Sequence, residues 1–224
     1  MAEDRFSDQL RASAAVIWEA QHAHPFVVGI GDGTLDFERF AFWVRQDYLF
    51  LIEYSRMLAI GAARAPELAT MRRFADLAQA TLSDEMDLHR SYCEELGISR
   101  EELEREPIAP TTRGYTDFLV RVAQSGDFAE LVAALLPCMW GYSVIGRRLA
   151  DRGLPVDERY AKWIQMYAST DFAELADWCR ELADEVGAGI PPAARARATE
   201  AFRTSSRYEL AFWEMAWAGE SWPA

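Results

Sequence analysis

Apolar residues recur every three or four positions over most of the 224-residue chain. This spacing is typical of amphipathic helices, and strand-like alternation does not extend over any useful length. Gly- and Pro-rich breaks separate the helical segments, and we predict a packed loop over 25–35. The pattern therefore predicts an all-α bundle of about eight helices, at 6–23, 36–65, 66–96, 112–125, 128–151, from 157, 169–186 and 192–218, with a short extra helix from 99.

Composition narrows the class of protein. Half of the residues are hydrophobic, which is enough for one core, so we expect a single domain over 1–224. The net charge of -13 argues against nucleic acid or an anionic membrane as partner and favours a small molecule. Three scattered cysteines without a CxxC pair, no signal-peptide pattern and no run of about eighteen apolar residues predict a cytoplasmic protein.

Cys138 stands in the middle of the predicted helix over 128–151, directly after Pro137. A proline inside a helix removes one backbone donor and usually leaves a kink. Helical spacing places the thiol on an inward face, together with Leu131, Ala134, Leu135, Tyr142 and Ile145. Such a thiol is either a small buried hydrophobic group or a nucleophile.

Asp47 is a carboxylate within an otherwise aromatic helical stripe. The other members of the stripe are Phe40, Trp43, Phe50 and Tyr54. An ionised acid among rings needs a partner, because burial without one is costly. We expect either an arginine of a neighbouring helix, Arg56 or Arg147, or a bound ligand.

Glu209 has similar surroundings in the predicted last helix, where its face carries Phe202, Phe212 and Trp213. Cys138, Asp47 and Glu209 thus lie on inward faces of three helices. A thiol beside a carboxylate can act as a nucleophile, and an acid among rings suits a flat heterocycle that contains nitrogen. The pattern favours covalent catalysis, and we expect the three groups to converge.

Glu85 and His89 are one helical turn apart and could supply two ligands to iron. We favour a solvated face for this pair, because charge runs on helices are usually exposed. An oxygenase that binds haem through His22 or His24, or two irons through Glu85 and His89, is the rival enzyme class. A protein that binds or senses its ligand without turnover is the rival outside the enzymes.

Four blocks of the chain resemble the TenA family, also called thiaminase II. They are HPFVVGIGDGTL at 24–35, QDYLFL at 46–51, LPCMWGY at 136–142 and YELAFWEMA at 208–216. The resemblance spans residues 5 to 218 and implies a haem-oxygenase-like fold, a homotetramer, and catalysis without metal or other cofactor. The reaction that it implies converts 4-amino-5-aminomethyl-2-methylpyrimidine to the hydroxymethylpyrimidine used in thiamin salvage. Many members also cleave thiamin, so the physiological substrate (the aminopyrimidine, a formylated relative or thiamin) stays open.

The resemblance also implies roles for individual residues. It makes Cys138 the nucleophile, Glu209 the general acid and base, and Asp47 the acid that binds the amino group and ring nitrogen of the pyrimidine. Positions that match ring-contacting or hydroxyl-donating residues are Phe50, Tyr115, Tyr142, Tyr167 and Phe212. Tyr54, from the stripe of Asp47, completes the expected substrate-binding set.

Overall fold

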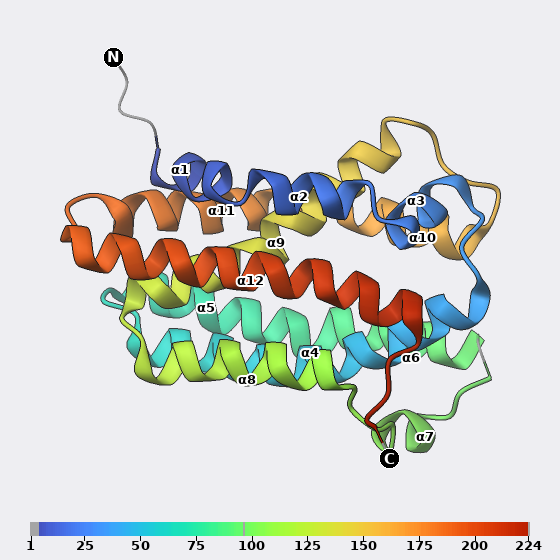
Figure 1. The fold of residues 1–224 in the computed structure, drawn as a ribbon. Coiled ribbons are helices and arrows are strands. Elements are labelled where there is room, and N and C mark those ends of the chain that lie inside the picture. The colour runs from blue at the N-terminus through green and yellow to red at the C-terminus, as the bar shows by residue number, and fades with distance from the viewer. Residues whose placement is uncertain (1–4, 96, 224) are drawn as a thin grey trace. The chain divides into compact units, whose positions relative to one another are not determined.

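The computed structural model describes residues 5–95 and 97–223, and every regular element in these ranges is helical (Figure 1). The all-α class is confirmed, but the described residues form twelve α-helices and one π-helical segment rather than about eight helices. Their bounds are α1 Phe6–Ser13, α2 Ala15–His22, α3 Pro25–Asp32, α4 Phe37–Arg64, α5 Leu68–Ala80, η1 Thr81–Glu85, α6 Met86–Glu95, α7 Arg100–Glu104, α8 Pro110–Ser125, α9 Phe128–Ala150, α10 Glu158–Tyr167, α11 Thr170–Gly187 and α12 Pro192–Ala218.

The segment expected to be a loop over 25–35 is mostly helix α3. His24 caps the helix, since its Nδ1 accepts a hydrogen bond from the Phe26 N–H at 3.2 Å, and Pro25 occupies the first turn. The helix ends at Gly33, whose φ of 70° suits glycine. Gly31 lies inside the helix and packs closely on α9, since a Cβ there would come within 2.7 Å of Leu149 Cδ2. The prediction was wrong because close packing outweighs the low helix propensity of glycine.

Two expected long helices are interrupted. The segment 6–23 breaks at Ala14, whose φ of -117° and ψ of 15° lie outside the helical region, and α1 and α2 follow one another (Figure 1). The segment 66–96 contains α5, the π-helical turn η1 and α6. The helix expected over 36–65 is confirmed as α4, where Asp36 Oδ1 accepts hydrogen bonds from the N–H groups of Glu38 and Arg39.

The chain divides into two compact units, and the first comprises Met1–Leu35 and Ala129–Glu214. Helix α9 forms the core of this unit. It is long and apolar enough to span a membrane, but 78% of its most apolar window is buried within the structure. Such burial is what the core helix of a folded domain shows.

The second unit comprises Asp36–Phe128 and Met215–Ala224. Here α4 packs against α5, α6 and α8, and α4 and α8 lie side by side in Figure 1. Arg64, at the end of α4, donates to the carbonyl oxygens of Ala123 and Gly126 at 2.5 and 2.6 Å and so ties α4 to the end of α8. The single domain expected from composition stays a prediction.

Candidate active site

Two contacts set the register of α9 against α12 within the first unit. Ser205 Oγ donates to the Ala134 carbonyl oxygen at 2.8 Å, and the Tyr142 and Trp213 rings have centroids 5.3 Å apart. In both pairs the residue numbers differ by 71. Equal differences at two points two turns apart mean that the helices run in the same direction in a constant register, as Figure 1 also shows.

The residue numbers of Cys138 and Glu209 also differ by 71, and both residues lie midway between these two contacts along their helices. The register therefore places the thiol and the carboxylate at the same level of the two helices. Glu209 is 2% exposed, whereas Cys138 is partly exposed. Cys93 and Cys179 are buried, and burial raises the pKa of Cys93 to about 11. Cys138 is thus the most accessible of the three cysteines, and access is one requirement of a nucleophile.

Aromatic rings of α9, α10 and α12 surround this level. The Tyr142 ring lies 4.8 Å from the Tyr167 ring, and Tyr167 lies 4.7 Å from Trp163, between centroids. Phe212, one turn from Glu209, is 2% exposed. A Cβ added to the buried Gly141, three residues after Cys138, would meet no atom within 4 Å. Rings with open space beside them can hold a planar ligand.

Asp47, in the second unit, has a partner that we did not expect. Its Oδ2 lies 2.7 Å from Nε2 of His89, and the two residues are 4% and 1% exposed. The predicted arginine partners lie elsewhere: Arg56 pairs with Glu53, and Arg147 donates to a backbone carbonyl of its own helix. The solvated face predicted for His89 was wrong, and the side chain of Glu85 lies outside the described residues.

The charged residues around His89 are the reason that the sequence missed this pair, because charge runs on helices usually lie on exposed faces. His89 instead lies on a buried face of α6, together with Met86, Tyr92 and Cys93. The helix follows directly after the π-helical turn η1. The apolar residues at Met86 and Tyr92 were the signal available in the sequence.

The predicted aromatic residues of the second unit form one cluster. The Phe50 ring stacks on Tyr54 with centroids 5.4 Å apart and lies 5.0 Å from Tyr115 on α8. Gln46 fixes the chain that leads into α8, because its amide donates to the Pro107 carbonyl and accepts from the Ala109 N–H, both at 2.9 Å. Tyr115 is thus positioned by α4 at two points.

The remaining histidines serve the fold of the first unit. His22 Nδ1 lies 2.9 Å from Nη1 of Arg148, and burial, followed by that guanidinium, lowers the pKa of His22. His24 caps α3, and its Nε2 lies 3.1 Å from Glu214. Among the described residues, no three His, Cys, Asp or Glu side chains are grouped so that they could hold a metal ion.

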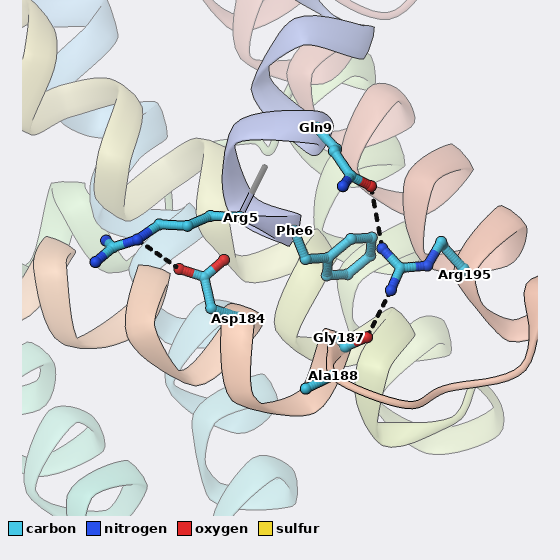
Figure 2. A pocket seen from close by; sticks show the side chains of 7 residues that line it. All are labelled: Arg5, Phe6, Gln9, Asp184, Gly187, Ala188 and Arg195. Atoms are coloured by element: carbon cyan, nitrogen blue, oxygen red, sulfur yellow. Dashed lines mark hydrogen bonds and ion pairs between the residues drawn. The ribbon is translucent and has the colours of Figure 1, made fainter. Parts of the chain in front are cut away.

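A surface hollow of about 570 Å³ lies at the ends of α1, α11 and α12 (Figure 2). Arg195 stacks on the Phe6 ring at 4.5 Å and donates to Gln9 and to the Gly187 carbonyl, while Asp184 accepts from the Ser7 N–H at 2.7 Å. Figure 2 shows Arg195 directed at Gln9 and Gly187, and Asp184 directed at Arg5. The residues that line the hollow include none of the predicted site residues, and their polar groups join the three helices.

Known proteins resemble the chain over nearly its whole length. Residues 11–219 match the TENA/THI-4/PQQC family. The chain belongs to this family. It is 46% identical to an aminopyrimidine aminohydrolase of Halalkalibacterium halodurans over 97% of both chains. It is 41% identical to an aminopyrimidine aminohydrolase of Bacillus subtilis, over 97% of this chain and 92% of the relative.

Solved structures confirm the fold. A TenA homologue from P. horikoshii OT3 matches with a TM-score of 0.89 and 32% identity, over 96% of this chain and 99% of the other. A domain with a haem-oxygenase-like fold from Shewanella denitrificans matches with a TM-score of 0.74 at 14% identity, over 95% of this chain and 92% of the other. The expected haem-oxygenase-like helical fold is therefore confirmed.

Proposed function

We propose that this TenA family member is an aminopyrimidine aminohydrolase of thiamin salvage. The observation that carries the proposal is the 46% identity, over 97% of both chains, to a protein of that name. The reaction consumes 4-amino-5-aminomethyl-2-methylpyrimidine and water and yields the hydroxymethylpyrimidine and ammonia. Activity on thiamin itself belongs to the same proposal, because thiamin carries the same pyrimidine with a different leaving group.

We propose that the chain forms a single catalytic domain. Two aminopyrimidine aminohydrolases match 97% of the chain, which supports one activity for the whole chain. Asp47 then binds the amino edge of the pyrimidine, and Glu209 and Cys138 act at the carbon centre. The rings that hold the pyrimidine are those of Phe50, Tyr54, Tyr115, Tyr142, Tyr167 and Phe212.

The proposed reaction follows from the chemical groups that these residues supply. The Cys138 thiolate adds to an electrophilic ring carbon, and Asp47 stabilises the protonated ring that makes the addition possible. Ammonia leaves the exocyclic methylene with a proton from Glu209. Water then adds to that methylene and gives a proton back to Glu209, and the sulfur leaves the ring last as a thiolate. The sum is replacement of the amino group by hydroxyl.

The assembly and location of the enzyme are part of the same proposal. The family resemblance supports a homotetramer that works without cofactor, and the three scattered cysteines without a CxxC pair support a cytoplasmic location. Light scattering coupled to gel filtration tests the assembly, and the expected mass is four times the 25.4 kDa of one chain. A monomer mass contradicts this part of the proposal and leaves the reaction untouched.

Steady-state rates with a substrate panel test the function. We expect the purified protein to release ammonia from the aminopyrimidine with a higher kcat/KM than it shows for a formylated relative or for cleavage of thiamin. Pyrimidine binding without turnover of any panel member would contradict the enzyme and indicate a binding protein. An absorption spectrum with a Soret band, or stoichiometric iron, would instead indicate the oxygenase alternative.

A further inference from the structure

We propose that His89 is the positioning residue for Asp47 and that it determines how tightly the pyrimidine is bound. This inference rests on the proposed function, because it concerns the substrate that Asp47 binds. It adds to the site a residue of another helix, α6, which contacts both Asp47 and Trp43 of α4.

The contact between the two side chains has the geometry of a strong hydrogen bond. Nε2 of His89 lies 2.7 Å from Oδ2 of Asp47, and the residues are 1% and 4% exposed. An ionised carboxylate only accepts hydrogen bonds, so the imidazole N–H is the donor. This bond uses one oxygen of Asp47 and fixes the plane of the carboxylate. The other oxygen, Oδ1, is then directed to accept hydrogen bonds from a ligand.

His89 is itself held in place by packing. Its ring lies 5.9 Å from the ring of Trp43, between centroids, and Trp43 precedes Asp47 by one helical turn on the same face of α4. Trp43 is fully buried. The imidazole therefore approaches Asp47 from a fixed direction. A rigid partner lowers the cost of ordering the carboxylate when the ligand binds.

The local backbone gives independent support. His89 lies one helical turn after the π-helical turn Thr81–Glu85. Single π-helical turns occur frequently at functional sites. A buried pair of ionisable groups is also a poor way to stabilise a fold, since apolar residues of similar volume do so at least as well. Both features indicate that the pair is kept for what Asp47 does.

A double-mutant cycle separates positioning from general stability. The variants are His89→Leu, which removes the donor, His89→Gln, which retains an N–H donor, Asp47→Asn, and the His89→Leu/Asp47→Asn double variant. If His89 acts through Asp47, His89→Leu lowers kcat/KM for the aminopyrimidine about 10- to 100-fold, the size usual for a lost hydrogen bond to a charged group. His89→Gln restores activity to within about fivefold of wild type. In the Asp47→Asn background, His89→Leu costs less than about twofold more.

The second measurement is the affinity of the same four variants for the hydroxymethylpyrimidine product, determined by calorimetry. We expect the Kd of the product to rise in the variants in which kcat/KM falls. A circular dichroism spectrum that matches the wild-type spectrum shows that each variant is folded. The inference is overturned if His89→Leu keeps the wild-type Kd and kcat/KM. It is also overturned if His89→Leu lowers kcat/KM as much in the Asp47→Asn background as in the wild-type protein. Absence of turnover in the wild-type protein instead overturns the proposed function.

Nitrogen-15 NMR of the wild-type protein keeps the inference testable if His89→Leu does not fold. The chain has only three histidines, and the Asp47→Asn variant identifies the signals of His89. We expect Nε2 to be protonated and to shift when the hydroxymethylpyrimidine product saturates the site, because the ligand contacts the acceptor carboxylate. Imidazole signals that stay unchanged at saturation overturn the inference.

Discussion

Gly146 lies where α9 packs closely against the end of α10. A Cβ added there would lie 2.6 Å from the carbonyl carbon of Tyr167, 2.7 Å from its Cβ and 2.8 Å from the backbone nitrogen of Ala168. Atoms of a backbone cannot rotate away as the end of a flexible side chain can. Gly146→Ala must therefore move α10, and Tyr167 with it, away from Tyr142.

The expected loss of stability in Gly146→Ala follows from two opposing effects. Overpacking of this kind costs about 1–3 kcal/mol, and alanine recovers up to about 1 kcal/mol of helix propensity over glycine. The expected net loss is about 1–2 kcal/mol, which corresponds to a fall in Tm of about 2–8 °C for a chain of this size. The Tyr142 and Tyr167 rings are 4.8 Å apart. Displacing a ring that orients the substrate should lower kcat/KM about 10-fold or more.

Gly31→Ala is the matched control. Its added Cβ would also lie 2.7 Å from a neighbouring atom, but that atom is the flexible end of Leu149. We expect a change in stability within about 1 kcal/mol and an unchanged kcat/KM. Calorimetric Tm values and ammonia release from the aminopyrimidine compare the two variants. A Gly146→Ala protein as stable and as active as Gly31→Ala would refute the reasoning about this contact.

Three further predictions concern single side chains. Glu209→Gln should lower kcat about 10²- to 10⁴-fold in steady-state assays, because it removes the acid for the leaving amine, and an unchanged kcat would exclude this role. Maleimide at neutral pH should label Cys138 well before the buried Cys93, as peptide mapping by mass spectrometry would show; equal rates would contradict the exposure difference. Burial lowers the pKa of His22 from its ordinary value of 6.5, so the unfolded chain takes up the proton first and the free energy of unfolding should decrease as the pH falls below 6.5. His22→Gln should weaken this pH dependence of the free energy of unfolding, measured by denaturant titrations at pH 5 to 7.5. An unchanged pH dependence would show that other groups cause it.

Local periodicity predicted most elements because each long helix buries one continuous stripe. Helix α4 runs from Phe37 to Arg64, within one residue of the prediction at each end, because Asp36 caps it and its aromatic stripe is regular. Periodicity failed where tertiary contacts decide the backbone. Glycines close to neighbouring side chains made α3 appear to be a loop, and the break at Ala14 has no signal in the hydrophobic pattern.

The candidate site was likewise predicted only in part from the sequence. Helical spacing placed Cys138 beside Tyr142 and placed Asp47 among rings, because residues three and four apart share a face. It could not supply the register between α9 and α12, which depends on contacts such as Ser205 to Ala134. The burial of His89 was also missed, because its charged neighbours indicated an exposed face.

The central claim is that the thiol of Cys138 is the nucleophile for pyrimidine chemistry. The most direct measurement is the rate of ammonia release from the aminopyrimidine by Cys138→Ser, compared with the wild-type protein under the same conditions. We predict a fall in kcat of about 10³-fold or more, with an unchanged Tm and retained pyrimidine binding, because only the attacking atom is replaced. Turnover near the wild-type rate would contradict the claim.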